Sequence, residues 1–172
     1  MLLNDNVMTD PGLASSLTRR LRAAVPLAQA LGFSVDEVTP ERSVFSLAAA
    51  PLAVNQNETF QASTFYILAD YAVGLACFAS FPEYSLFGLS DAQPGGVVLQ
   101  GWLKDGYVKH VKPAKGGLRA VVSIPESERE RMIRELKTAG KTTCQGEAQI
   151  FQAGTDTLVA LAKHTVVFIA QT

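Results

Sequence analysis

The chain has 172 residues, of which 48% are hydrophobic and 18% are charged, and its formal net charge is −1. This length and composition suit one globular domain and exclude a disordered chain. The near-neutral charge provides no basic surface that would attract nucleic acid or an anionic membrane, so neither is expected as a partner.

The N-terminus lacks the basic stretch and apolar core of a secretory signal. We expect residues 1–12 to be flexible and residues 13–172 to form the single domain of a cytoplasmic protein. The two cysteines, Cys77 and Cys144, fit no Cys-x-x-Cys pattern. In the cytoplasm both thiols are expected to be reduced, with Cys77 packing as a small apolar side chain.

Hydrophobic periodicity predicts the first elements. Leu13, Leu17 and Leu21 recur every four residues, which predicts an amphipathic helix. Pro26 interrupts this helix or starts a second one, and Gly32 is a helix stop. Apolar and β-branched residues then predict strands at 33–38 and 43–50.

The segment at residues 60–81 is largely apolar and approaches the length of a membrane span. It contains Asp70 near its centre, which is costly in a bilayer, so we interpret the segment as a helix buried in a globular domain. We predict that the helix begins near Ser63 or Thr64, either of which can cap it, and ends before Pro82.

The C-terminal half alternates strands, turns and one further helix. Ser127 and Glu130 have the spacing of a capping box for a helix that Pro125 opens and Gly140 stops. The remaining predictions are a connection at 84–96 with a Pro-Gly-Gly turn, and strands at 97–112, 118–124, 142–153 and 157–170. Strands with segregated helices predict an α+β fold in which an antiparallel sheet wraps around one long apolar helix.

The segment at residues 55–70 resembles a motif of hotdog-fold thioesterases. Those proteins often carry N-G-H-Q-T-x-H-G-G-x-L-x-x-L-A-D before and into their central helix, and this chain has N-Q-N-E-T-F-Q-A-S-T-F-Y-I-L-A-D. The matching residues are Asn55, Thr59, Leu68, Ala69 and Asp70.

The flanks of this segment are similar to a branch of the same superfamily. Residues 26–33 resemble its P-L-A-x-x-L-G-F start, and residues 107–113 resemble its Y-x-x-x-x-x-P strand end. That branch comprises thioesterases similar to the C-terminal domain of a bacterial acetyltransferase-like protein, and phenylacetate-pathway thioesterases belong to the same superfamily. The resemblance implies the hotdog fold and hydrolysis of an acyl thioester.

The chain departs from the motif at its His-Gly-Gly, where it has Gln61-Ala62-Ser63. In the relatives, a glycine N–H at the start of the central helix polarises the thioester carbonyl. Because a backbone N–H is the donor, Ala62 or Ser63 can also form this oxyanion hole, although each adds a Cβ that narrows the approach.

Asp70 is the candidate for the second half of the chemistry. Its carboxylate can act as a general base on water or attack the carbonyl itself, and burial in an apolar helix is expected to raise its pKa. The alternative is a purely structural carboxylate. Asn55 either orients a water or holds the loop through an Asx turn, and Gln61 either binds substrate or is a polar loop residue.

Substrate contacts are expected from the same helix and from a basic turn. Thr64, Tyr66 and Gly74 are the predicted acyl contacts, and Asp70 shares its helix face with Ser63, Tyr66, Gly74 and Cys77. Lys112, Lys115 and Arg119 flank a Gly-Gly turn and are either solvated or positioned for the phosphates of coenzyme A.

The resemblance therefore implies a thioesterase that acts on a small-molecule acyl thioester and associates as a homodimer or homotetramer. No metal or cofactor is expected, and coenzyme A enters only as part of the substrate. One alternative is a non-catalytic acyl-binding hotdog protein in which Gln-Ala-Ser marks a lost oxyanion hole. Another is an acyl dehydratase, which we disfavour because that chemistry pairs an acid with a histidine, and neither His110 nor His164 is expected near the helix.

Overall fold

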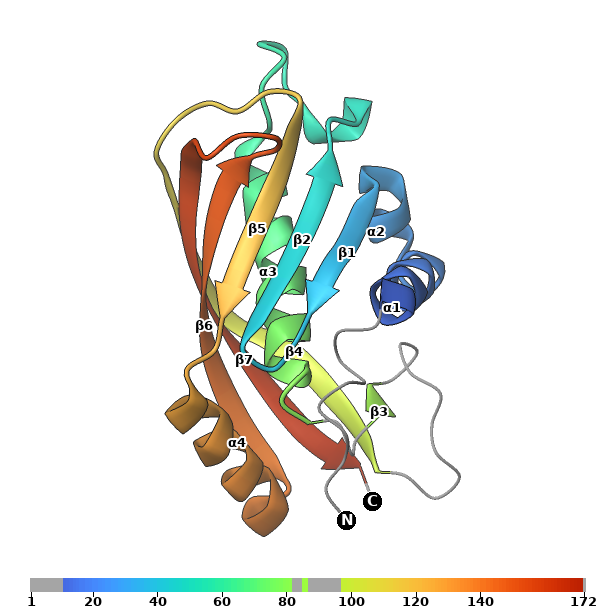
Figure 1. Ribbon diagram of the computed structural model, residues 1–172, viewed down its shortest axis with the longest axis vertical. Coiled ribbons are helices and arrows are strands. Elements are labelled where there is room, and N and C mark those ends of the chain that lie inside the picture. The colour runs from blue at the N-terminus through green and yellow to red at the C-terminus, as the bar shows by residue number, and fades with distance from the viewer. Residues whose placement is uncertain (1–10, 82–84, 87–96, 172) are drawn as a thin grey trace.

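The structure is a computed structural model that describes residues 11–81, 85–86 and 97–171. Most of its secondary structure lies in strands, with one long helix at the centre (Figure 1). The elements in chain order are α1 (Pro11–Ala24), α2 (Pro26–Leu31), β1 (Phe33–Val38), β2 (Arg42–Ala48), the 3₁₀ turn η1 (Pro51–Ala53), α3 (Ala62–Phe78), β3 (Ser85–Leu86), β4 (Val98–His110), β5 (Gly117–Ser123), α4 (Glu126–Ala139), β6 (Lys141–Gln152) and β7 (Leu158–Gln171).

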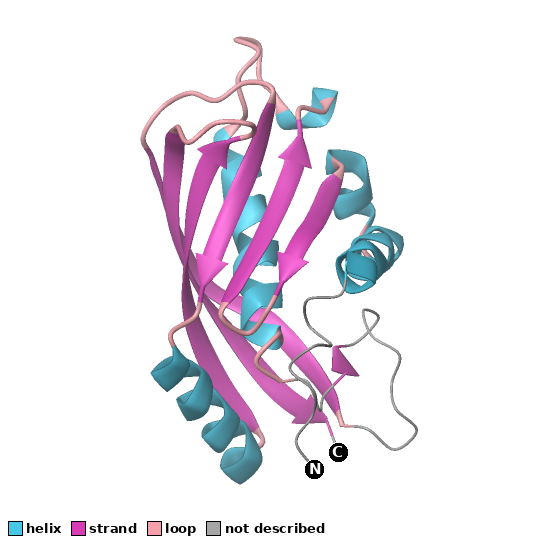
Figure 2. Cartoon of the chain, in the orientation of Figure 1, coloured by secondary structure: helices cyan, strands magenta, loops and turns pink. Residues whose placement is uncertain are grey.

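The strands form one sheet in the order β1-β2-β5-β6-β7-β4-β3. Every pairing is antiparallel except that of β3 with β4, which is parallel. The sheet curls around α3, while α1 and α2 lie beside β1 and α4 packs outside the curl against β6 (Figure 2). The predicted α+β architecture, an antiparallel sheet around one long helix, is confirmed.

The composition of α3 explains why the sheet curls around it. Most of its residues are buried, because strands contact it on several sides. Along β6 and β7 buried and exposed residues alternate, so each strand directs one set of side chains at the helix. Gly146 of β6 permits the closest approach, since a Cβ there would lie 2.6 Å from Cγ1 of Val73.

The helix starts differ from the sequence prediction. α3 begins at Ala62 with Gln61 as its N-cap, and the cap makes no side-chain hydrogen bond, so neither Ser63 nor Thr64 caps it. The predicted capping box in α4 is also wrong, because the N-cap there is Pro125 and no side chain caps the helix. The predicted stops at Gly32 and Gly140 are confirmed, and both residues adopt the left-handed conformation.

The cysteines are not free thiols, in contrast to the expectation. Cys77 of α3 and Cys144 of β6 form a disulfide, and both residues are fully buried. The two residues are 67 positions apart in the sequence, and only the fold brings α3 against β6. Because disulfides are rare in reducing compartments, the expectation of two reduced thiols is wrong, and the cytoplasmic location from which it followed stays a prediction.

Other sequence expectations concern the termini and the connections. α1 begins at Pro11, two residues before the predicted start of the domain, and residues 1–10 lie outside the described part, so the domain boundary stays a prediction. The connection predicted at 84–96 falls outside the described residues except for β3. Within the described ranges, no helix has the length and apolarity needed to cross a membrane.

Candidate functional site

The N-terminus of α3 presents backbone donors that the helix itself leaves unpaired. Gln61 is extended (φ −65°, ψ 148°), and its amide Nε2 donates to the carbonyl of Val54 over 3.1 Å. Ala62 and Ser63 follow as the first helical residues, and both are exposed. The N–H groups of a first helical turn have no acceptor within the helix, so this end is suited to bind a carbonyl oxygen or an oxyanion.

The loop before α3 is held by Asn55. Its Oδ1 accepts hydrogen bonds from the backbone N–H of Asn57 over 2.9 Å and from the hydroxyl of Thr59 over 3.1 Å. A short bridge between Val54 and Phe60 closes the loop. These contacts are those of an Asx turn, the structural one of the two roles considered for Asn55.

We expect Asn55→Ala to lower the free energy of unfolding by about 1 kcal/mol, because the loop loses the side-chain oxygen that accepts hydrogen bonds from Asn57 and Thr59. Asn55→Asp retains an acceptor oxygen and should leave both stability and any turnover close to wild type. Thermal unfolding of both variants, followed by circular dichroism, measures the difference. Equal stability of Asn55→Ala and wild type would show that the Asx turn does not hold this loop.

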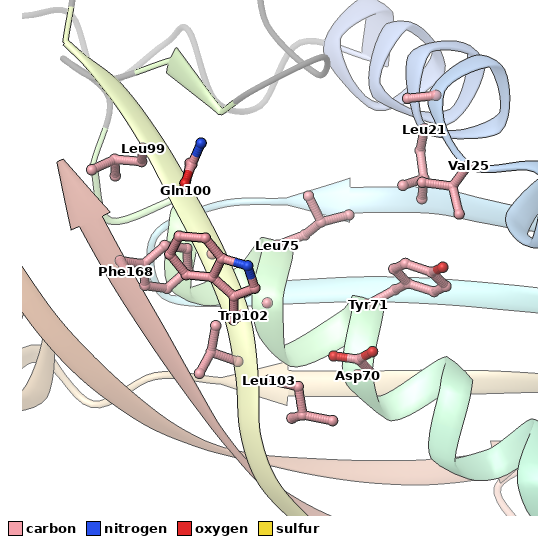
Figure 3. Close-up of a pocket in the computed structure, with 14 residues that line it drawn as sticks. Leu21, Val25, Asp70, Tyr71, Leu75, Leu99, Gln100, Trp102, Leu103 and Phe168 are labelled. Carbon is pink, nitrogen blue, oxygen red and sulfur yellow. The ribbon is translucent and has the colours of Figure 1, made fainter. Parts of the chain in front are cut away.

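Asp70 lies two turns into α3 and lines a cavity of about 630 Å³. Figure 3 shows the carboxylate of Asp70 projecting from α3 toward β4, on the side where Trp102 and Leu103 lie. The other walls come from the end of α1, which contributes Leu21, and from β7. The surroundings of Asp70 are therefore mostly hydrocarbon.

Burial raises the pKa of Asp70, as the sequence analysis expected. The neighbouring Tyr71 also has a raised pKa, first because of burial and second because of the negative charge of Asp70. A carboxylate with a raised pKa is a stronger base than ordinary aspartate, which suits it to remove a proton from water.

The two halves of the predicted site are far apart within one chain. Asp70 follows Ala62 by eight residues of a continuous helix, which at 1.5 Å per residue is about 12 Å. A water attacking a carbonyl lies only about 3 Å from the carbonyl carbon, whose oxygen must touch the N–H donors. The helix start and Asp70 of the same chain therefore cannot act on one carbonyl group.

The edge of β4 is a surface through which two chains can associate and bring the helix start of one chain near Asp70 of the other. β3 pairs only with Val98 and Leu99, so no described strand pairs with this edge along residues 100–110. This stretch also carries two exposed aromatic side chains, Trp102 at 49% and Tyr107 at 65% exposure. A long open edge with apolar side chains is normally paired or covered in native proteins.

The structure places Tyr66 against a histidine that the sequence analysis did not connect to the helix. The ring of His164 on β7 lies 4.6 Å from that of Tyr66, centroid to centroid. His164 is fully buried, and neither ring nitrogen has a hydrogen-bond partner among the described residues. Gly106 of β4 lies opposite, where a Cβ would meet both the imidazole and the Tyr66 hydroxyl at about 2.7 Å.

Both histidines therefore contact the beginning of α3, and the expectation that neither lies near the helix is wrong. The ring of His110 packs edge-on against Phe65 with centroids 5.0 Å apart. Burial lowers the pKa of His164, and the negative charge of Asp105 acts in the opposite direction. The sequence could have revealed the position of His164. In the predicted strand at 157–170, side chains alternate between the two faces, which places His164 on the same inward face as Val166 and Phe168.

The remaining predicted substrate residues are only partly brought together. Thr64 is buried and its hydroxyl donates to the carbonyl of Ala53, which is a structural contact. Lys112 and Lys115 flank Ala114, whose carbonyl accepts from the N–H of Phe60 over 3.1 Å, so they lie at the N-terminal end of α3.

Arg119 is not with these lysines. It lies on β5, stacks over the ring of Phe151 at 5.2 Å, and is 3.8 Å from the carboxylate of Asp156. Its strand neighbours Leu118 and Ala120 are buried, which directs Arg119 to the face of the sheet opposite α3. Gly74 and Asp70 of α3, in contrast, line one cavity, and their contact with a substrate stays a prediction. No group of three or more histidine, cysteine or acidic side chains within the described ranges is arranged to hold a metal ion.

No family model matches the sequence, and no curated protein is found as a relative. Solved structures do match. A protein of unknown function from Chlorobaculum tepidum has a TM-score of 0.76 at 16% identity, covering 95% of this chain and 99% of that one. A thioesterase family protein from Silicibacter pomeroyi has a TM-score of 0.65 at 16% identity, covering 92% and 99%.

The PaaI protein of E. coli, from the phenylacetic acid degradation operon, has a TM-score of 0.56 at 16% identity, covering 90% of this chain and 94% of that one. Sequence identities this low are informative about the fold. The chain therefore has the hotdog fold of these neighbours, as the resemblance of residues 55–70 implies.

Proposed function

We propose that this protein hydrolyses an acyl thioester, with acyl-coenzyme A or a carrier-protein thioester as the substrate. The observation that carries the proposal is Asp70, a carboxylate with a raised pKa in the wall of an apolar cavity of about 630 Å³. A carboxylate in such surroundings is costly unless it has a partner or a function.

The chemistry follows from the two halves of the site. Asp70 takes a proton from a water molecule, and the water oxygen bonds to the thioester carbon. The negative charge that develops on the carbonyl oxygen is stabilised by the N–H groups of Ala62 and Ser63 at a helix N-terminus. The carbon–sulfur bond then breaks, the thiolate leaves and takes up a proton, and the carboxylic acid is released.

The separation of about 12 Å along α3 requires that these halves come from two chains. We propose a homodimer in which the open edges of β4 from two copies pair antiparallel and extend the sheet. A two-fold axis at this edge makes the two α3 helices antiparallel, so that Ala62 of one chain can approach Asp70 of the other. Further association to a tetramer remains a prediction.

Thiol release tests this proposal. The purified protein is incubated with acetyl-, octanoyl-, palmitoyl- and phenylacetyl-coenzyme A, and free thiol is measured with a chromogenic disulfide reagent that is added after quenching. We expect release from at least one substrate well above the spontaneous rate. Tight binding of an acyl-coenzyme A without any release would favour the non-catalytic acyl-binding alternative.

The two histidines beside α3 give the dehydratase alternative a structural basis that the sequence did not suggest. Dehydration and its reverse interconvert a 3-hydroxyacyl and a 2-enoyl thioester without breaking the carbon–sulfur bond. The same assay therefore includes a trans-2-enoyl-coenzyme A, with its conjugated absorbance followed in parallel. Loss of that absorbance without thiol release would replace hydrolysis by hydration in our proposal.

A further inference from the structure

Gly74 lies in the interior of α3, where glycine is among the least favourable residues. Other glycines of this fold have a packing reason: a Cβ at Gly101 or Gly146 would meet a neighbouring side chain at less than 3.0 Å. At Gly74 a Cβ would meet nothing within 4 Å, and the backbone is that of an ordinary helix. Neither packing nor backbone geometry therefore explains this glycine.

The open space beside Gly74 is the cavity that Asp70 lines, one helical turn away. The cavity is walled by α1, α3, β4 and β7, and its volume of about 630 Å³ is within the range of small-molecule sites. Its lining is mainly aliphatic and aromatic, and no lysine, arginine or histidine belongs to it among the described residues. An anionic group would meet Asp70 there without a compensating cation.

We infer that this cavity holds the uncharged hydrocarbon part of the acyl group, an alkyl chain or aromatic ring much larger than acetyl, and that Gly74 sets how large it is. The inference rests on the proposed function and adds a substrate class to it. The phosphates of coenzyme A remain outside, since the cavity offers them no cation.

Trp102 provides a direct measurement of occupancy. It is the only tryptophan of the chain and it lines the cavity, so its emission reports on what fills the cavity. The probe is S-octyl-coenzyme A, a thioether that has no carbonyl and cannot be hydrolysed, with S-methyl-coenzyme A as the short reference. We expect the octyl compound to shift Trp102 emission to shorter wavelength and to bind at least about tenfold more tightly than the methyl compound.

Three variants in the cavity wall test the cavity and the role of Gly74, and a fourth serves as a matched control. Gly74→Leu should weaken S-octyl-coenzyme A at least about tenfold and leave the methyl compound unchanged, because the new side chain fills open space. Ala24→Leu places a leucine side chain in the cavity from α1, and Ala23→Leu, on an exposed neighbour outside the lining, should have no effect. Gly74→Ala should raise the Tm while weakening octyl binding by a smaller factor.

Equal affinity for the octyl and methyl compounds, or octyl affinity unchanged in both Gly74→Leu and Ala24→Leu, would overturn the inference. If Gly74→Leu fails to fold, Ala24→Leu decides. Because the thioethers are not hydrolysed, failure here is distinct from failure of the proposed function. Length-dependent binding without turnover of any thioester would refute hydrolysis alone, and turnover without length dependence would refute the cavity assignment alone.

Discussion

Asp70→Asn is expected to lower kcat/KM for thioester hydrolysis by roughly 10²–10⁴-fold, the contribution typical of a positioned general base. Asparagine keeps the size and shape of the side chain but cannot take a proton from water. The cavity and the helix start are left as they are, so KM should change much less than kcat. Steady-state kinetics of thiol release on the best substrate of the panel measure both.

The pH dependence gives a second readout of the same residue. Because burial raises the pKa of Asp70, the base is protonated over a wider acidic range than ordinary aspartate. Activity should be full above this raised pKa and fall as the pH decreases through it, so the acid limb of kcat/KM lies above the usual aspartate range. In Asp70→Asn this limb should disappear from the residual activity.

The free energy of unfolding should depend on pH in the opposite direction to activity. A carboxyl group whose pKa is raised by folding favours the folded state at pH values below the unfolded pKa, and this contribution is lost as the pH rises through the folded pKa. Above its raised pKa the ionised Asp70 therefore destabilises the fold, and Asp70→Asn should there have a Tm at least as high as wild type. Together with lost turnover, a preserved or raised Tm would separate a catalytic role from a structural one.

Asp36→Asn is the matched control. Asp36 on β1 also has a pKa raised by burial, but it bonds to Ser46 and lies outside the cavity. Its substitution should leave kcat, KM and the acid limb unchanged. Full activity of Asp70→Asn, or equal losses in both variants, would contradict the assignment of Asp70 as the base.

The architecture was predictable because local signals and tertiary packing agree. The alternation in residues 142–153 and 157–170 predicts two strands with one buried face, and the structure forms them as β6 and β7. The apolar segment at 60–81 is hydrophobic nearly all round, which requires a sheet that surrounds it. Asp70 was recognisable as a candidate for the same reason, because it is a carboxylate within a largely apolar helix.

The features that the sequence did not reveal depend on contacts between distant segments. Cys77 and Cys144 are brought together only when α3 lies against β6. His164 contacts Tyr66 because β7 packs against the start of α3. Arg119 does not belong to the site because its position on β5 directs it to the sheet face opposite α3. The predictions of the two helix N-caps were wrong for a local reason. The extended segments before α3 and α4 end at Gln61 and Pro125, so each helix is capped two residues before Ser63 or Ser127.

The second large loss of activity is expected from a substitution at the start of α3. Ala62→Pro removes one N–H donor at the first position of α3, and losing one such donor typically costs roughly 10²–10³-fold in kcat. Proline is well tolerated there, because its missing N–H has no acceptor in the helix and Gln61, the residue before it, is already extended at φ −65° and ψ 148°. We therefore expect a folded variant with little turnover.

A mixture of the two inactive variants tests whether one site is shared between two chains. When Asp70→Asn and Ala62→Pro chains are refolded together in equal amounts, half of the dimers contain one of each. In these, the Asp70 of one chain faces the intact helix start of the other at one of two sites, so about a quarter of wild-type activity should return. Each variant refolded alone should stay inactive.

The reverse arrangement distinguishes this from a site within one chain. When a chain that carries both substitutions is refolded with an equal amount of wild type, every mixed dimer has an incomplete half at both sites. A shared site then leaves about a quarter of the activity, whereas a site within each chain leaves about half. No recovery in the first mixture together with half activity in the second would refute the shared site. That outcome would also conflict with the separation of about 12 Å along α3 on which the dimer is argued, so the mixtures test directly whether the two halves of the site come from different chains.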